Sequence, residues 1–146
     1  LEVMLRDPFF REQPPKSTGT DYFNQSWIKQ NVSNCKSIFS PEDIQATLTE
    51  LTAQVIFKEL KNLKAQKKRI YICGGGIHNT FLINRLEGII ENNIFSTSLL
   101  GIDPDILEAS CFAWLAKQRL DRKKFDLTKI TGSRGRVLLG EVWEAS

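Results

Sequence analysis

Ile70-Tyr71-Ile72-Cys73-Gly74-Gly75-Gly76-Ile77-His78-Asn79 is the stretch that decides the fold class of this chain. Its first four residues form a short apolar run between a basic turn and three glycines, which is typical of a buried parallel strand. The glycines end the strand, and the apolar pattern that follows predicts a helix starting near His78 or Asn79. We therefore expect a strand, a glycine turn and a helix in succession.

The residues before this stretch predict a long helix. Ser40-Pro41-Glu42-Asp43 is a strong start signal, because serine accepts from free amides, proline suits the first turn and acids favour the positive end of the helix dipole. Apolar residues then recur at helical spacing over residues 41–64. They predict one apolar stripe made of Ile44, Leu48, Leu51, Val55, Ile56, Leu60 and Leu63.

The residues after it complete an α/β unit. Residues 94–97 predict a second strand, and Asp103-Pro104 predicts the start of a further helix. A strand, helix, strand, helix order makes the two strands parallel neighbours joined by a right-handed crossover. The expected fold class is α/β, a parallel βαβα unit packed with a long helix.

Three regions are expected along the chain. Residues 1–36 are predicted to be irregular with one short helix, residues 40–120 to form an α-β-α-β-α core, and residues 121–146 to form a tail. In the tail, Val137-Leu138-Leu139 is strand-like.

The first region carries two local signals. The apolar residues of 1–5 are expected to form a strand end. A short helix through Trp27 and Ile28 is predicted to be capped by Thr20 or Asp21.

Composition excludes several classes of protein. The chain has 146 residues, 41% of them hydrophobic and 25% charged, which suits one soluble globular domain with a real core. A net charge of +3 gives no argument for nucleic-acid binding. No apolar run is long enough to span a bilayer, and acidic and basic residues interrupt the N-terminus where a signal peptide would be apolar. Neither a nucleic acid nor a membrane is therefore expected as a partner.

The cysteines and the histidine point to a cytoplasmic protein without a metal site. Cys35, Cys73 and Cys111 are an odd number without a CxxC pair, which suits a reducing compartment. Cys73 and Cys111 lie in apolar runs and are expected to be buried. His78 is the only histidine, so a His-dependent triad or a multi-histidine metal site is not predicted.

The glycine turn is the first candidate binding site. Ligands bind at the C-terminal edge of open α/β sheets, and glycines let the backbone approach a flat ring or a phosphate. Asn79 can cap the following helix and still present its amide group. The turn is neither a GxGxxG fingerprint nor a P-loop. A tight turn with glycines for close helix–strand packing explains the spacing equally well.

Several further short segments are weak signals individually, but together and in this order they are specific to one protein family. They are Asp7-Pro8-Phe9-Phe10; Pro14-Pro15-Lys16-Ser17-Thr18-Gly19; Phe23-Asn24 with Trp27; Cys73-Gly74-Gly75-Gly76 with Asn79; Gly101-Ile102-Asp103-Pro104-Asp105; Glu108-Ala109; Phe112-Ala113-Trp114-Leu115-Ala116; Thr131-Gly132; and Leu139-Gly140. Together they resemble the anhydro-N-acetylmuramic acid kinase family of the actin/hexokinase-like ATPase superfamily, over nearly the whole chain.

The resemblance implies a fold and a reaction. The fold is two actin-like (RNase H-like) ATPase domains around a deep cleft, of which this chain is the C-terminal portion. Such kinases open the ring of 1,6-anhydro-N-acetylmuramic acid with water and phosphorylate O6 with ATP and Mg²⁺. The product, N-acetylmuramic acid 6-phosphate, belongs to bacterial peptidoglycan recycling, and family members look dimeric.

The resemblance also assigns residues. Gly74, Gly75, Gly76 and Asn79 look like the adenosine-contacting residues, and Glu108 looks like the glutamate that orients the sugar. A carboxylate in the first turns of a helix can accept from a sugar hydroxyl or a reacting water. Without the resemblance, a glutamate that satisfies the helix dipole is the favoured interpretation of Glu108.

Some residues stay without a role or depart from the family pattern. Lys16-Ser17-Thr18-Gly19 matches the family, but no role follows from the match. Ile77 is bulkier than the usual residue and is expected to narrow the adenine pocket. Ser133-Arg134 replaces a more apolar pair, an expected surface change.

Three hypotheses follow. The family's phosphate-binding glycine loop and its catalytic aspartate have no counterpart here, so the first is a C-terminal kinase fragment that catalyses nothing unaided. The second is a non-enzymatic module that pairs with a chain supplying the N-terminal kinase half, or with its own copy. The third is an unrelated α/β domain whose glycine turn binds phosphate and polyanions.

Overall fold

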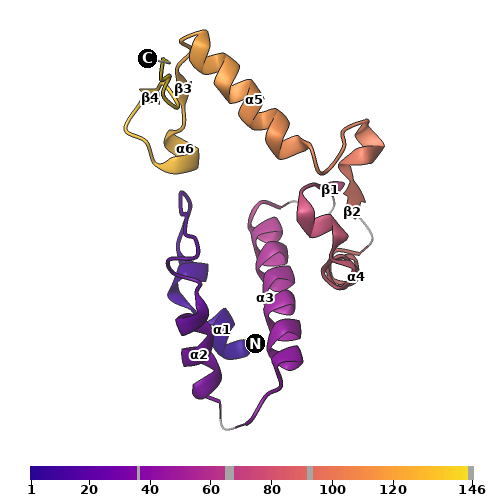
Figure 1. Cartoon of the computed structure of the whole chain (residues 1–146). Coiled ribbons are helices and arrows are strands. Elements are labelled where there is room, and N and C mark those ends of the chain that lie inside the picture. The colour runs from indigo at the N-terminus through magenta and orange to yellow at the C-terminus, as the bar shows by residue number, and fades with distance from the viewer. Residues whose placement is uncertain (36, 65–67, 92–93, 145–146) are drawn as a thin grey trace.

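The computed structural model describes residues 1–35, 37–64, 68–91 and 94–144. The chain is mixed α/β, with several helices and a small parallel sheet (Figure 1). In chain order the elements are α1 (Glu2–Leu5), η1 (Pro8–Arg11), α2 (Gln25–Ser33), α3 (Pro41–Asn62), β1 (Ile70–Ile72), η2 (Gly75–His78), α4 (Thr80–Ile89), β2 (Ile94–Ser96), η3 (Thr97–Leu100), α5 (Leu107–Leu120), β3 (Phe125–Asp126), α6 (Thr128–Thr131) and β4 (Arg136–Val137), where η marks a 3-10 helix.

The predicted parallel strand pair is confirmed. β1 pairs with β2 in parallel, with Ile70 opposite Ile94 and Ile72 opposite Ser96. α4 connects the two strands, and β1 leads into the glycine turn as expected. The C-terminal ends of both strands therefore lie at one edge of the sheet, which is where ligands bind in α/β folds.

The start of the long helix α3 is also confirmed. The Ser40 side chain accepts from the Asp43 amide at 3.1 Å, and the Asp43 carboxylate accepts from the Ser40 amide at 3.2 Å. Pro41 occupies the first helical position, where its missing N–H costs no hydrogen bond. This reciprocal capping box fixes where the helix begins.

α3 packs on two sides, so the prediction of a single apolar stripe is wrong. One core contains Met4, Phe10 and Leu51, and the other contains Ala53, Leu86 and Ile90. α3 contributes to both and lies between the N-terminal helices and the α4–sheet unit (Figure 1). Leu63, which the stripe would have buried, is 71% exposed.

An ion pair joins α3 to α4 beside the second core. Arg85 on α4 donates from Nη2 to the Glu50 carboxylate on α3 at 3.1 Å, and Gln54 donates to the same carboxylate at 2.7 Å. These hydrogen bonds, that of Arg85 foremost, lower the pKa of Glu50 below its ordinary value of 4.5.

The pair is expected to make stability depend on acid pH. The unfolded chain takes up a proton at Glu50 before the folded chain does, because the folded-state pKa is the lower one. The stabilisation is thus complete above about pH 4.5 and is lost as the pH falls through the folded-state pKa. Thermal melts at pH 7 and pH 3.5 should show a smaller acid loss in Glu50→Gln than in the unmodified protein. Arg85→Gln should show the same reduction, and equal losses in all three proteins would contradict the prediction.

The N-terminal segment differs from the sequence expectation in two places. Residues Glu2–Leu5 form the helix α1 and not a strand, because Met4 turns into the first core, where it is 4% exposed. α2 is capped by Asn24 and not by Thr20 or Asp21. The Asn24 side chain accepts from the amides of Ser26 and Trp27 at 2.9 and 3.0 Å.

The Asp7 carboxylate connects three parts of this segment. It accepts from the Phe9 amide at 2.9 Å, from the Tyr22 hydroxyl at 3.0 Å and from Trp27 Nε1 at 2.8 Å. The hydrogen bond to Asp7 raises the pKa of Tyr22. Asp7 thereby ties η1, the following loop and α2 together.

Replacing Asp7 by alanine is expected to lower stability by about 2–4 kcal/mol, since a helix cap is lost and two further side-chain donors lose their acceptor. Urea unfolding followed by circular dichroism measures this change. The NMR indole N–H resonance of Trp27 should move toward its unfolded position. Asp21→Ala removes a single exposed hydrogen bond, to the Gly19 amide, and is the matched control. Equal effects of the two variants would contradict the prediction.

The C-terminal part begins differently from the prediction. α5 starts at Leu107 with Ile106 as its cap residue, not at Asp103-Pro104. It leads away from the sheet to a small antiparallel pair in which Phe125 lies opposite Val137 (Figure 1). The predicted strand 137–139 is wrong beyond Val137, where β4 ends.

Much of the surface is uncovered. The chain exposes 11278 Å², whereas a compact monomer of its mass, 16.7 kDa, exposes about 7,600 Å². Cys73 and Cys111, expected to be buried, are exposed, because Cys73 follows a strand at an open sheet edge and Cys111 lies on α5 away from both cores. Among the described helices, none combines the length and apolar character needed to cross a membrane.

Candidate functional site

The glycine turn lies at the C-terminal edge of the sheet, directly after β1. Gly74 has φ 79° and ψ 174°, a combination essentially limited to glycine. η2 follows, and Asn79 then caps α4 by accepting from the Leu82 amide at 3.0 Å. The turn is therefore a short 3-10 segment held between a strand and a capped helix.

Packing does not account for all three glycines. An added Cβ atom at Gly74 or Gly75 meets no described atom within 4 Å, and at Gly76 it meets only the Leu82 side chain, at 4.0 Å. Gly74 is required by its backbone conformation, but neither of the other two is required by a close approach of helix and strand. The packing interpretation is thus weakened at Gly75 and Gly76, and the turn offers an open backbone surface.

A groove of about 370 Å³ lies next to this surface. Gly76 and Cys73 line it at one end, and apolar side chains of β1, β2, α3 and α4 form the rest. Its volume is within the range of small-molecule sites. Ile77, expected to narrow such a pocket, is not among the described residues that line it. The groove therefore offers an apolar wall beside the polar backbone of the turn.

Two contacts hold the turn against the loop that precedes α5. The Gly74 amide donates to the Pro104 carbonyl at 2.8 Å. His78 Nε2 lies 2.8 and 3.0 Å from the two Asp105 carboxylate oxygens. We call these two contacts together the turn–loop contact. Within the loop, the Asp103 side chain accepts from the Asp105 amide at 2.9 Å and so closes a turn instead of capping a helix.

Glu108 lies three residues after Asp105, in the first turn of α5. Its side chain is exposed, and no hydrogen bond to it is found among the described residues. A carboxylate in this position is free to accept from a ligand. The sequence predicts the turn and Glu108 as separate candidate residues. In the structure, His78 at the end of the turn contacts Asp105, which lies three residues before Glu108.

His78 and Asp105 are the residues at this site that sequence reasoning did not assign. From the sequence, His78 is the single histidine and a candidate helix start, and Asp105 is part of a matching segment; neither is predicted to bind a ligand or to contact the other. They are 27 residues apart. A polar side chain two residues after the third glycine is the available signal, but its partner depends on tertiary structure.

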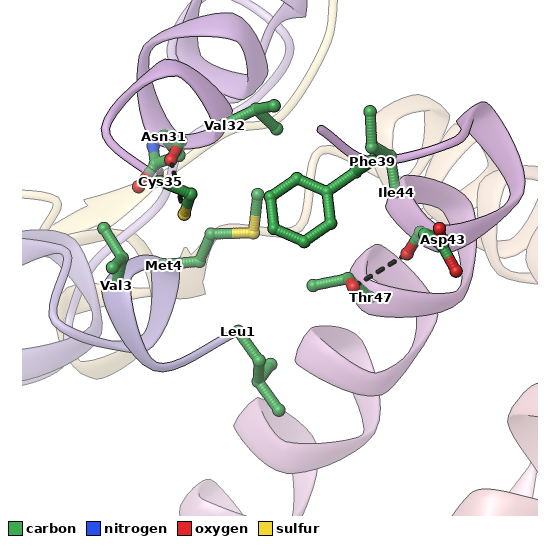
Figure 2. A pocket seen from close by; sticks show the side chains of 10 residues that line it. All are labelled: Leu1, Val3, Met4, Asn31, Val32, Cys35, Phe39, Asp43, Ile44 and Thr47. Carbon is green, nitrogen blue, oxygen red and sulfur yellow. Dashed lines mark hydrogen bonds between the residues drawn. The ribbon is translucent and has the colours of Figure 1, made fainter. Parts of the chain in front are cut away.

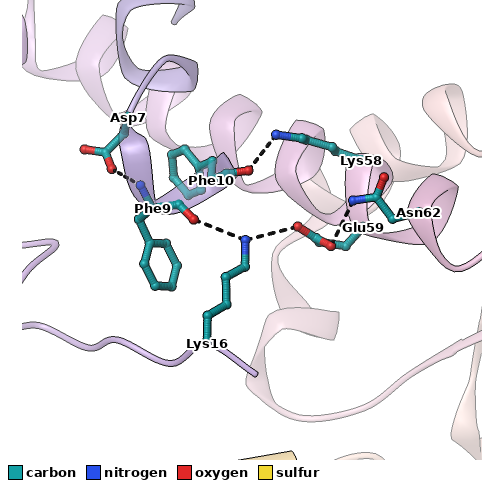
Figure 3. Close-up of polar contacts among 7 residues, drawn as sticks. All are labelled: Asp7, Phe9, Phe10, Lys16, Lys58, Glu59 and Asn62. Atoms are coloured by element: carbon teal, nitrogen blue, oxygen red, sulfur yellow. Dashed lines mark hydrogen bonds and ion pairs between the residues drawn. The ribbon is translucent and has the colours of Figure 1, made fainter. Parts of the chain in front are cut away.

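Lys16, in the segment without an assigned role, has structural contacts (Figure 3). Its Nζ donates to the Phe9 carbonyl at 3.2 Å and to Glu59 at 3.3 Å, and its side chain is only 14% exposed. Hydrogen bonds from Asn62 and from Lys16 lower the pKa of Glu59. Lys16 therefore fastens its segment to η1 and α3.

A second, more enclosed cavity lies between α1, α2 and the start of α3 (Figure 2). Its polar lining is already occupied: Asn31 donates to the Trp27 carbonyl at 2.9 Å, and Thr47 donates to the Asp43 carbonyl at 2.7 Å. Phe39, Met4 and other apolar side chains form the remaining wall. The two remaining polar groups of the lining also have partners: Cys35 Sγ lies 3.5 Å from the Asn31 carbonyl, and the Asp43 carboxylate belongs to the capping box of α3.

Metal binding finds no support in the part of the chain that is described. No group of three or more histidine, cysteine, aspartate or glutamate residues lies close enough there to hold a metal ion.

Comparison with known proteins identifies the family. The family model for anhydro-N-acetylmuramic acid kinase matches residues 1–145. A protein of Coxiella burnetii (strain RSA 493 / Nine Mile phase I) named anhydro-N-acetylmuramic acid kinase is 43% identical over 141 residues, which are 96% of this chain and 37% of that protein. One of the same name from Legionella pneumophila (strain Corby) is 44% identical over 144 residues, covering 98% of this chain and 38% of the relative. The chain thus spans less than two fifths of the length of these relatives, and it belongs to the anhydro-N-acetylmuramic acid kinase family.

Proposed function

We propose that this chain is the C-terminal portion of a bacterial, cytoplasmic kinase with the actin-like fold. The kinase consumes 1,6-anhydro-N-acetylmuramic acid, water and ATP and releases N-acetylmuramic acid 6-phosphate and ADP, a step of peptidoglycan recycling. The observation that carries the proposal is the family match over residues 1–145, and the open glycine turn, held by the turn–loop contact next to the start of the helix bearing Glu108, supports it. The unpaired cysteines support the cytoplasmic setting.

The residues of this chain have two roles in the proposal. The backbone of Gly75 and Gly76 receives the adenosine, whose ring packs in the neighbouring apolar groove, while Asn79 holds the start of α4 behind the turn. Glu108 accepts a hydrogen bond from a sugar hydroxyl or from the attacking water and so orients the reacting centre. Bound ATP supplies the phosphoryl group that is transferred. The base that activates water is expected on the remainder of the kinase, and no step is assigned to a metal.

A second candidate is a non-enzymatic module that pairs with another chain. The uncovered surface supports pairing: on α5, Phe112 is 64%, Trp114 50% and Leu120 70% exposed. A helix with apolar residues around its whole circumference is normally buried. The two candidates differ in whether the paired assembly turns over substrate.

One experiment tests both. The polypeptide is incubated with ATP, Mg²⁺ and 1,6-anhydro-N-acetylmuramic acid, alone and with the part of the Coxiella burnetii relative that this chain does not match. Mass spectrometry then detects the hydrated, phosphorylated sugar. We expect no product from the chain alone and product from the mixture. Formation of a complex without product would favour the non-enzymatic module, and no complex and no product would contradict both.

A further inference from the structure

The turn–loop contact fastens the glycine turn at both of its ends to one loop. Gly74, at the start of the turn, bonds the Pro104 carbonyl, and His78, at its end, bonds the Asp105 carboxylate. Two attachments at opposite ends restrict rotation as well as translation of the turn relative to the loop. A single contact would leave the turn free to pivot.

Stability alone is a weak explanation for the His78–Asp105 pair. The two side chains are 65% and 54% exposed, and exposed ion pairs add little to stability because water screens them. The pair connects residues 27 positions apart, so it does not support a local helix. Its effect is on the relative placement of two segments.

The loop continues directly into the helix that carries Glu108. The Ile106 amide donates to the Asp103 carbonyl at 3.3 Å, and the Ser110 amide donates to the Ile106 carbonyl at 2.9 Å. Two backbone hydrogen bonds therefore connect the loop to the first turn of α5. Asp105 lies in this loop, between the glycine turn that it contacts and the helix that carries Glu108.

We propose that His78 and Asp105 are positioning residues that couple occupancy of the glycine turn to the placement of Glu108. This inference rests on the proposed function, in which a nucleotide lies on the turn and a sugar faces Glu108. Coupling between two sites requires that each ligand favours the same arrangement of the element between them. The turn–loop contact is that element, and nucleotide and sugar strengthen each other's binding through it.

Calorimetric titration measures the coupling directly. ADP is titrated into the longest natural polypeptide that contains this sequence, or into its complex, with and without saturating 1,6-anhydro-N-acetylmuramic acid. The ratio of the two dissociation constants is the coupling factor, which is typically above about five-fold where two sites communicate. His78→Gln and Asp105→Asn should each lower this factor about two- to five-fold, the range expected for one exposed pair. The double variant should lower it no further than either single one.

Lys117→Gln is the matched control. It removes an exposed contact to an aspartate carboxylate within one helix, in which Lys117 Nζ lies 3.1 Å from the Asp121 carboxylate at the far end of α5. The coupling factor should stay unchanged in this variant, and the melting temperatures of all variants should agree within about 2 °C.

The outcomes separate the two proposals. Lower coupling in both site variants but not in the control supports the inference. Binding of both ligands with a coupling factor unchanged by His78→Gln and Asp105→Asn, or with no coupling in the unmodified protein, overturns the inference and leaves the proposed function standing. Absence of binding of either ligand to the folded protein overturns both.

Discussion

Gly75→Asp is expected to weaken nucleotide binding at least about 100-fold without unfolding the protein, because the bound adenosine would have to displace or desolvate a carboxylate on the surface that receives it. The side chain itself has room, since an added Cβ atom at Gly75 meets no described atom within 4 Å. The new carboxylate instead occupies the open face of the turn, where it obstructs a flat ring and repels phosphate groups. Titration with Mg-ADP in a calorimeter measures the loss.

Two other glycines provide the controls. Gly88→Asp adds the same carboxylate to α4, again in open space, and should leave nucleotide affinity unchanged. Gly74→Ala should act in the opposite way, lowering stability by about 1–3 kcal/mol because alanine is strained at φ 79° and ψ 174°. Comparing the three variants separates blocked binding from damaged folding.

The results discriminate between sites. Unchanged affinity in Gly75→Asp would place the nucleotide elsewhere on the protein. A uniform loss of affinity in Gly75→Asp and Gly88→Asp would indicate a long-range effect of charge, which added salt would suppress. Only a loss confined to Gly75→Asp supports the turn as the binding surface.

The segments that sequence predicted well are those whose structure is decided locally. Ser40 and Asp43 cap α3 through residues three positions apart, and the β1–glycine–α4 succession follows from composition along one short stretch. The parallel pairing of β1 with β2 then follows from the connection between them. In each case, neighbouring residues contain the information.

The errors arise where distant contacts decide. The sequence predicts a strand at residues 1–5, because a short apolar run does not distinguish the period of a strand from that of a helix. In the structure this segment is a helix, and Met4 is buried in the core beside α3. Asp103-Pro104 was expected to start a helix, because the local signal is the same for a cap and a turn. In the structure Asp103-Pro104 forms a turn, and the Gly74 amide donates a hydrogen bond to the Pro104 carbonyl. No local sequence pattern predicts this long-range bond.

In the candidate site too, single residues could be predicted from the sequence, whereas contacts between distant residues could not. The family resemblance named the glycines, Asn79 and Glu108, but the spacing of residues did not say how these groups are placed relative to one another. The His78–Asp105 contact, which joins the glycine turn to the loop before α5, could be seen only in the structure. The exposure of Cys73 and Cys111 was missed for a related reason: their apolar neighbours would be buried in a compact protein, and here much surface stays uncovered.

Glu108→Gln is expected to lower kcat/KM for the sugar about 10- to 100-fold in the active assembly. The substitution keeps the size of the side chain but removes its charge, and a hydrogen bond to a charged acceptor contributes about 1.5–3 kcal/mol. KM for ATP, measured at saturating sugar, should stay unchanged, because Glu108 faces the sugar in the proposal. Steady-state kinetics with each substrate varied in turn separates the two effects.

A further variant tests the competing interpretation, in which Glu108 only interacts favourably with the dipole of its own helix. Glu2 is also an acid in the first turn of a helix, α1, which lies beside the opposite end of α3 from the sheet (Figure 1). Glu2→Gln removes an acid from the first turn of this shorter, four-residue helix and should leave the kinetics unchanged. If Glu108→Gln shifted only the melting temperature, as Glu2→Gln can, then Glu108 would act on the helix and not on the sugar. A change confined to the kinetics with sugar assigns the carboxylate to the substrate.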